Sequence, residues 1–282
     1  MTSSNSMRDS RQGLVLVTGG AGTLGSLVVD RLREHGRTVR VVSRRGSGPR
    51  DDVEYVSGDL DSGAGIAEAA GVDTIVHCAG SQKGDGEKAR HLVDAARAAG
   101  VRHVVYISVV GADRVPVESR TDHAMFEYYA QKREGELVIE RSGIPFSTLR
   151  ATQFFSLVHL VAQSLSRSPI IPLPKRMRVQ PVAAEEVADR LVQLAEGAPA
   201  GYVPEFGGPR VYGTHDLMRS YLRSTGKRRW MVSVGLPGRA AKAVLRDAII
   251  TEGGDRGTVT WEEYLRSREP VAAQASSLSP RP

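Results

Sequence analysis

The sequence predicts an α/β fold in which a doubly wound parallel sheet is completed by a smaller C-terminal lobe. Short apolar runs rich in β-branched residues alternate with helical patterns over residues 13–150, as expected of parallel strands that helices cover on both faces. A glycine-rich turn joins the first run to the first helix. Beyond residue 150 several prolines interrupt the alternation. This predicts a lobe over 151–270, between tails at 1–12 and 271–282 that we expect to be disordered.

The first half supplies the strands and helices of the sheet. Residues 14–18 (LVLVT) form a continuous apolar run, and apolar residues recur every three or four positions over 24–35, which predicts a strand followed directly by a helix. Similar patterns predict strands at 38–43, 53–57, 74–78, 104–109 and 146–149, and helices at 91–99 and 128–141. The polar segment 115–126 fits a substrate lid or, slightly better, a solvated loop.

The second half is less regular and reads as a dependent lobe. Helical patterns predict helices at 185–196, 214–225, 238–247 and 260–268, with a short strand near 202–206. No repeat at a fixed period marks this half as a copy of the first. We therefore expect it to complete the sheet of the first half and to help form a substrate pocket.

Composition and charge exclude several classes of protein. Apolar residues make up 40% of the chain and charged residues 25%, which is ordinary globular usage. The N-terminus lacks the apolar core of a signal peptide, and no apolar run approaches the length of a membrane span, so we expect a cytoplasmic protein without membrane contact. A single cysteine, Cys78, gives neither an internal disulfide nor a metal cluster.

The net charge of +6 lies entirely in the second half of the chain. Basic clusters at 175–178 (KRMR) and 227–229 (KRR) contribute much of it. Both clusters lack the aromatic interleaving and the motifs of nucleic-acid binders, so we expect no nucleic-acid partner. A solvated surface is the simpler interpretation, with an acidic partner or substrate as the alternative.

The glycine-rich turn is the strongest functional signal. Residues 17–25 read VTGGAGTLG, in which Gly19, Gly22 and Gly25 close a strand and open a helix. Glycines at this spacing permit a tight turn, a close approach of the backbone to a pyrophosphate, and close packing of helix on strand. Thr23 and Leu24 begin the helix, whose free N–H groups would face the anion. The turn therefore predicts a dinucleotide site in a Rossmann-type fold.

The end of the second strand indicates which dinucleotide binds. NAD-binding proteins place an acidic residue there for the ribose 2′-hydroxyl, whereas this chain has Arg44 and Arg45. Two guanidinium groups suit a 2′-phosphate, so we predict NADP(H) in preference to NAD(H). Further cofactor contacts are expected from the residues that follow the third and fourth strands, namely Asp59, Leu60, Ala79 and Gly80.

These motifs together resemble the NmrA-like branch of atypical short-chain dehydrogenases/reductases. The resemblance extends over residues 13–268 and includes SRR (43–45), GDLD (58–61), VVYISVVGAD (104–113), YYAQKREGE (128–136), SGIPFSTLRATQFF (142–155) and VQPVAAEEVADRLVQLAEG (179–197). It implies one Rossmann domain with a small substrate lobe. It also implies one of two functions: an NADPH-dependent reductase of quinones, enones or other small carbonyl compounds, or a redox sensor that binds NADP(H) without catalysis.

A Tyr-x-x-x-Lys pair offers the chemistry of a reductase. Tyr128 and Lys132 lie at positions i and i+4, which share one face of a helix. A phenol could protonate the substrate oxygen as hydride arrives, and a neighbouring ammonium would favour the phenolate that remains. Ser108 could hydrogen-bond the same oxygen, although Val109 stands where many relatives carry a second small polar residue. Lys132 could also bind the cofactor by holding the nicotinamide ribose hydroxyls, and Tyr129 is an equally placed neighbour of Lys132.

Substrate contacts are expected from the segments around the long helix and after the sixth strand. The candidates are Met125, Tyr129, Thr152, Gln153 and Phe154. Aromatic residues gather in these segments, so we expect a flat aromatic or conjugated carbonyl compound or a quinone, and ordinary core packing is the alternative for Phe154. The other expectations are no metal ion and a possible homodimer.

Overall fold

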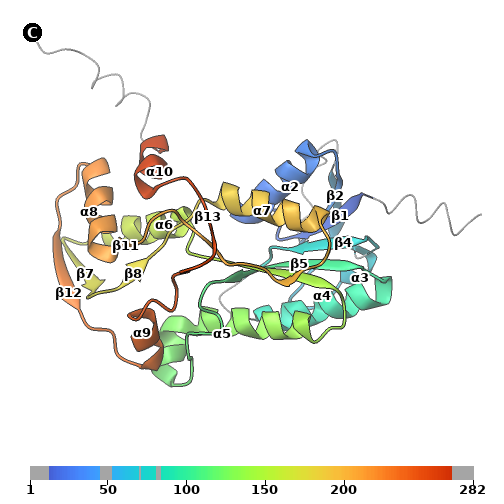
Figure 1. Cartoon of the computed structure of the whole chain (residues 1–282), viewed down its shortest axis with the longest axis horizontal. Coiled ribbons are helices and arrows are strands. Elements are labelled where there is room, and N and C mark those ends of the chain that lie inside the picture. Colours follow the sequence, from blue (N-terminus) through green and yellow to red (C-terminus); the bar gives the residue numbers. More distant parts are fainter. Residues whose placement is uncertain (1–12, 45–52, 70, 81–83, 269–282) are drawn as a thin grey trace, which may run out of the picture.

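The computed structural model describes residues 13–44, 53–69, 71–80 and 84–268 (Figure 1). Both segments expected to be disordered tails, as well as Arg45, lie outside these residues. The centre of the fold is a parallel sheet of nine strands in the order β13-β10-β6-β5-β4-β1-β2-β3, with β9 also pairing with β6. The strands are β1 (Leu14–Thr18), β2 (Thr38–Ser43), β3 (Val53–Ser57), β4 (Thr74–His77), β5 (His103–Val109), β6 (Phe146–Ala151), β9 (Gly201–Tyr202), β10 (Phe206–Gly207) and β13 (Asp255–Arg256).

Helices cover both faces of this sheet. The helices of the first half are α2 (Thr23–Glu34), α3 (Ile66–Ala69), α4 (Asp85–Ala99) and α5 (Arg120–Glu140), and α7 (Ala184–Glu196) comes from the second half. In β1, Val15 and Val17 face a core shared with α2 and α7, whereas Leu16 faces a second core under α4. Continuous apolar strands are therefore required, because side chains on both faces are buried. The predicted doubly wound α/β fold is confirmed.

The strand order reverses between β1 and β4, and this determines where a ligand would bind. β2 and β3 follow on one side of β1, and β4, β5 and β6 on the other. Crossovers leave this point in opposite directions, so a crevice opens at the carboxyl ends of β1 and β4. Two short strands of the second half, β10 and β13, extend the sheet beyond β6.

The remaining elements form a lobe with a third apolar core. These elements are α6 (Phe155–Leu165), β7 (Ile170–Pro174), β8 (Arg178–Val179), β11 (Tyr212–Gly213), α8 (Thr214–Ser224), β12 (Trp230–Val234), α9 (Arg239–Val244) and α10 (Trp261–Ser267). Phe155 and Trp261 are buried at the centre of this core. β7 pairs with β12 in a two-stranded parallel sheet at the end of the lobe away from the central sheet (Figure 1).

Several predictions about the elements were wrong, and the helix expected at 91–99 already begins at Asp85. The helix expected from Tyr128 begins at Arg120, because Ser119 and Asp122 form a reciprocal capping box that starts it earlier. Residues 120–126, expected to belong to a lid or loop, are therefore helical. The strand expected near 202–206 is divided into β9 and β10, both of which contact β6. β7 was not expected at all, since its prolines argue against a central strand; it is stable in a two-stranded sheet, where fewer N–H groups need partners.

Candidate functional site

The glycine turn after β1 has the close-packed geometry of a phosphate-binding loop. Gly19 has a φ of +71°, in the left-handed region, and its carbonyl oxygen accepts a 2.9 Å hydrogen bond from the Gly22 N–H. A Cβ on Gly25 would come 2.1 Å from the Gly19 oxygen, and a Cβ on Gly19 would come 2.7 Å from the Ala79 nitrogen. Glycine is thus required at position 25, where the first turn of α2 packs on the loop after β1, and at position 19, where this loop packs on the residues after β4.

The N-terminus of α2 is open to an anion. Gly22 is the N-cap, no side chain caps the helix, and its first turn holds no acidic residue. Gly22 and Thr23 are exposed, while Leu24 and Gly25 are buried and hold the helix against the sheet. Free N–H groups and the helix dipole therefore point out of the loop, which suits a pyrophosphate.

A cavity of about 410 Å³ lies at the ends of β2 and β3. It is lined by Arg44, Ser57, Gly58, Asp59, Ala64 and Gly65. The Arg44 side chain is largely exposed and lies 3.9 Å from a carboxylate oxygen of Asp61. Asp59 accepts hydrogen bonds from the Asp61 N–H and the Ser62 hydroxyl, whereas the side chain of Leu60 packs in the core under α4. The structure thus brings Arg44 and Asp59 together on one cavity.

Lys132 is the charged group at the carboxyl ends of β4 and β5. Its side chain is 4% exposed, and its Nζ lies 3.1 Å from Asp85 Oδ2 and donates to the Ile107 carbonyl at 3.3 Å. A Cβ on Gly80 would come 2.9 Å from this Nζ, so the glycine leaves room for the ammonium. Burial alone would lower the pKa of Lys132, but attraction to Tyr106, Tyr128 and Asp85 outweighs it and holds the pKa above its ordinary value. The lysine is therefore a buried permanent cation.

The two neighbouring tyrosines have different surroundings. The Tyr128 ring centroid lies 5.9 Å from Lys132 Nζ, and the side chain remains partly open to solvent. Burial raises the pKa of Tyr129, although a hydrogen bond from Gln153 acts in the opposite direction. The rings meet edge to face with their centroids 5.9 Å apart. Tyr128 thus lies beside the Lys132 ammonium and is open to solvent, whereas Tyr129 packs against the apolar core of the lobe.

The structure places Ser108 in a buried network centred on Glu136. Its hydroxyl donates to Glu136 Oε1 at 2.6 Å, and Glu136 is fully buried. The same carboxylate accepts two hydrogen bonds from Arg150, each 2.8 Å long, and one from Arg133 at 2.9 Å. Glu136 lies two helical turns beyond Tyr128 on α5. The Ser108 hydroxyl therefore donates to Glu136, while Lys132 Nζ donates to the carbonyl of the preceding residue, Ile107.

The residues expected to line a substrate pocket tie the lobe to the end of β6. The Thr152 hydroxyl donates to the Gln180 carbonyl at 2.5 Å, and the Gln153 amide donates to the Ile249 carbonyl at 3.2 Å. Phe154 forms an isolated bridge to Val182 and packs against the core under α2 and α7. The other two candidates are on α5, where Met125 is exposed and Tyr129 is half-buried.

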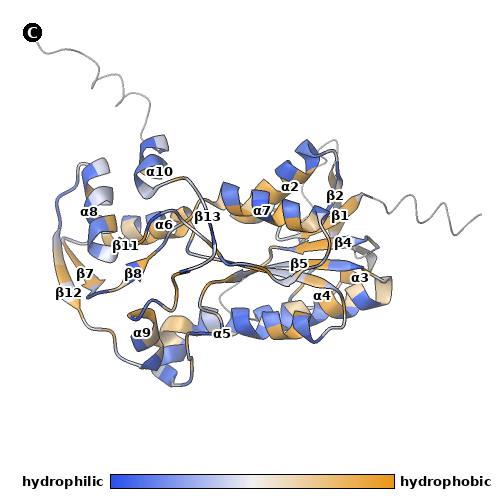
Figure 2. Cartoon of the chain, viewed as in Figure 1, coloured by the Kyte–Doolittle hydropathy of each residue, from blue (hydrophilic) through white to orange (hydrophobic). Residues whose placement is uncertain are grey.

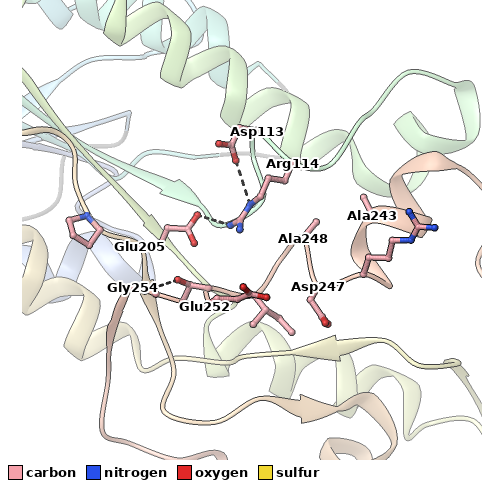
Figure 3. Close-up of a pocket in the computed structure, with 13 residues that line it drawn as sticks. Asp113, Arg114, Glu205, Ala243, Asp247, Ala248, Glu252 and Gly254 are labelled. Atoms are coloured by element: carbon pink, nitrogen blue, oxygen red, sulfur yellow. Dashed lines mark hydrogen bonds and ion pairs between the residues drawn. The ribbon is translucent and has the colours of Figure 1, made fainter.

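A cavity of about 720 Å³ lies elsewhere, between the loop after β5 and residues 243–254 (Figure 3). Arg114 reaches across its rim to Glu205, with 2.6 Å between the guanidinium and carboxylate atoms, and Asp247 and Glu252 are on the facing side. None of the residues predicted from the sequence lines it. The charged character of this cavity differs from the apolar pocket that we expected for a flat substrate.

Sequence reasoning missed several residues around Lys132. Asp85 is its ion-pair partner, and Tyr106 lies under it with the ring centroid 5.2 Å from Nζ. His77 stacks on Tyr106 with centroids 5.4 Å apart, and its Nδ1 lies 2.6 Å from the Thr18 hydroxyl. The one signal in the sequence was that His77 and Tyr106 belong to neighbouring predicted strands, whose carboxyl ends meet at the same edge of the sheet.

Comparison with known proteins agrees with this geometry. A family model described as NAD(P)H-binding matches residues 19–196, which is more than half of the chain. This chain belongs to the NAD(P)H-binding family. The family resemblance drawn from the motifs is thereby confirmed.

The relatives of this NAD(P)H-binding protein include named reductases. It is 29% identical over 267 residues to the ceramide reductase of Caulobacter vibrioides, covering 86% of this chain and 80% of that protein. It is 31% identical over 152 residues to the (4-alkanoyl-5-oxo-2,5-dihydrofuran-3-yl)methyl phosphate reductase of Streptomyces griseus, covering 51% of this chain and 49% of that protein. The Escherichia coli NADPH-dependent quinone oxidoreductase QOR2, solved with NADPH, superposes with a TM-score of 0.74 at 17% identity, covering 90% and 99% of the two chains. The last likeness shows the shared fold.

None of the helices in the described ranges combines the length and the apolar character needed to cross a membrane. Their apolar side chains pack instead against the central sheet or in the core of the lobe.

Proposed function

We propose that this chain is an NADPH-dependent reductase of a small aromatic or conjugated carbonyl compound or a quinone. The observation that carries the proposal is the buried ammonium of Lys132 beside Tyr128, at the crevice where the strand order reverses. The bound nicotinamide would supply hydride. A substrate oxygen that gains negative charge then needs a proton, and the Tyr128 hydroxyl is the group placed to give it. Lys132 favours the phenolate that remains.

The NADPH preference rests on Arg44. Its guanidinium lines the cavity that also holds Asp59, at the position where the ribose of a dinucleotide lies in this fold. The pyrophosphate would take the N–H groups of the glycine turn, and the 2′-phosphate would pair with Arg44. We expect Arg44→Gln to weaken NADPH binding by about tenfold or more while NADH binding changes little. Equal losses for the two cofactors in calorimetric titrations would refute this preference.

The relatives support reduction as the reaction class. The two relatives reported above are named as reductases, and QOR2 is named as a quinone oxidoreductase. The substrate class proposed here rests in addition on the aromatic and apolar residues Met125, Tyr128 and Tyr129, which lie within about one turn of α5. A conjugated π-system would pack against such side chains.

The decisive experiment measures NADPH oxidation with a panel of quinones and enones. Tyr128→Phe removes the proposed proton donor and Lys132→Met removes its cation, whereas Tyr129→Phe is the matched control. We expect about 100-fold or greater loss of kcat in the first variant and retention of most activity in the control. An active Tyr128→Phe enzyme together with an inactive Tyr129→Phe enzyme would exchange the roles of the two tyrosines.

A second candidate is an NADP(H) sensor that catalyses nothing. The engagement of the Ser108 hydroxyl by Glu136 favours it, because no serine on β5 is then left to hold a substrate oxygen. Tight NADP(H) binding without turnover of any compound in the panel would support the sensor and contradict the reductase.

A further inference from the structure

The two-stranded sheet of the lobe has an apolar outer face. Along β7 the side chains of Ile171 and Leu173 are buried in the lobe core, while Ile170 and Pro172 are exposed. Along β12 Met231 is partly buried against the same core, while Trp230 and Val232 are exposed. The strand register places Trp230 beside Ile170 and Val232 beside Pro172, so these four residues form one patch, which we name the outer face. Trp230 is 79% exposed, Ile170 53% and Val232 44%. Figure 2 shows both strands as hydrophobic elements at the far end of the lobe.

Cations lie at both ends of the outer face. Lys227, Arg228 and Arg229 lead directly into β12, and Lys175 and Arg176 directly follow β7. Because the two strands are parallel, one basic cluster stands at each end of the apolar patch. The sequence holds no Asp or Glu between residues 141 and 184 or between 217 and 246. Two clusters of basic side chains from the second half thus flank this patch.

This charge argues against a second copy of the chain as the occupant. A two-fold symmetric contact through the outer face would bring the same patch of two molecules together. Lys175, Arg176 and Arg228 of one copy would then meet the cations of the other with no acidic residue of these segments between them. Like charges brought together in this way oppose association.

We propose that the outer face docks on an anionic lipid surface. The indole of Trp230 suits the boundary between lipid headgroups and acyl chains, where one side of the ring is apolar and the other wet. The flanking lysines and arginines would lie at the level of the lipid phosphates. A protein partner is less well matched, because the four residues of the outer face line neither of the two cavities described above. A nucleic acid is less well matched because Trp230 is the one aromatic side chain on the patch.

This surface goes beyond the proposed reductase activity and does not depend on it. It departs from the sequence expectation of no membrane contact, which was based on the length of apolar runs. A search for long apolar runs does not detect the outer face. Its exposed apolar residues lie on two short strands and alternate with residues that face the other side. Peripheral docking needs only a few exposed side chains together with surrounding charge.

The two tryptophans of the chain allow a direct test. Trp230 is highly exposed, whereas Trp261 is fully buried and donates its indole N–H to the Ser220 hydroxyl. Vesicles that contain phosphatidylglycerol should therefore shift the fluorescence emission of the full chain to shorter wavelength and protect it from acrylamide quenching. Pure phosphatidylcholine vesicles should produce neither effect. Trp230→Ala should abolish the shift while the Trp261 emission remains.

Charge is tested by Lys175→Gln/Arg176→Gln/Arg228→Gln, three exposed side chains to which the structure assigns no side-chain partner. The control, Arg97→Gln/Arg102→Gln/Arg141→Gln, removes the same charge at the amino-terminal edge of the central sheet, where Arg97 and Arg102 pair with Asp94 and Asp73. Each cation near the lipid surface should raise the affinity for phosphatidylglycerol vesicles about fivefold. In a cosedimentation assay the first variant should therefore bind about 100-fold more weakly than wild type, and the control should bind like wild type.

Several results would overturn the proposal. They are the absence of vesicle binding by the wild type, equal losses in the two charge variants, and unchanged binding in Trp230→Ala. Quenching protection that grows with protein concentration in the absence of lipid, together with a dimer in analytical ultracentrifugation, would show that a second copy covers the outer face instead.

Discussion

Acidification should destabilise the protein through His77, the histidine at the end of β4. Its side chain is 1% exposed, and burial together with the charge of Lys132 lowers its pKa to about 3. In the unfolded chain the same imidazole has a pKa of about 6.5. Between these two pH values the unfolded state binds a proton that the folded state does not. Stability from this residue is therefore complete above about pH 6.5 and is lost as the pH falls toward 3.

The magnitude follows from proton linkage. While only the unfolded state is protonated, the free energy of unfolding falls by about 1.4 kcal/mol per pH unit. Lowering the pH from 7 to 5 crosses about 1.5 units of that window, which corresponds to a loss of about 2 kcal/mol from His77 alone. Carboxylates contribute little over this range, because most of them titrate near pH 4.

The assay is urea unfolding of the wild type and of His77→Phe at pH 7 and pH 5. Phenylalanine keeps a ring to stack on Tyr106 but cannot bind a proton. We expect the variant to have a lower free energy of unfolding at pH 7, because it loses the hydrogen bond between His77 and Thr18. Its free energy of unfolding should then fall by about 2 kcal/mol less than that of the wild type on acidification to pH 5. Equal losses in the two proteins would refute the argument that His77 is held neutral by its buried position.

Three further predictions follow from close contacts in the fold. Gly25→Ala places a Cβ 2.1 Å from the Gly19 oxygen and should abolish NADPH binding in calorimetry, whereas Gly235→Ala, whose Cβ meets nothing within 4 Å, should bind normally. Tyr106→Phe removes a buried hydroxyl for which the described structure provides no hydrogen-bond partner, so urea unfolding should show equal or about 1 kcal/mol greater stability, and a loss would reveal a partner. Glu136→Gln leaves buried cationic donors without their carboxylate and should cost about 3 kcal/mol or more, which a shift of the urea midpoint below 1 kcal/mol would contradict.

Features that depend on neighbouring residues could be predicted from the sequence. The glycine turn is one of them, because its spacing and its place between strand and helix define both the φ of Gly19 and the approach of Gly25. The core strands are another, because burial on two faces requires continuous apolar runs. Even there the start of α5 was misplaced, since the Ser119–Asp122 capping box was not recognised ahead of the apolar pattern.

Features that depend on distant partners could not be predicted. Lys132 was expected to face a cofactor, but nothing in its own segment indicated that Asp85, from the start of α4, would be its ion-pair partner. Ser108 was chosen for its place at the end of a strand, and nothing in that strand indicated that its partner would be Glu136, one helical turn beyond Lys132 on α5. Local patterns identify charged residues, but only the packing of helix on sheet decides which of them meet.

The buried charges of α5 explain why Tyr128 lies where it does. Tyr128, Lys132 and Glu136 are spaced four residues apart and share one face of the helix. Lys132 pairs with Asp85 of α4, while Glu136 is held by Arg150 of β6 and Ser108 of β5. Opposite charges with partners on different elements allow only one rotation of the helix, because any other would leave an ion buried without its partner. The serine thus helps to position the helix that carries the proposed proton donor.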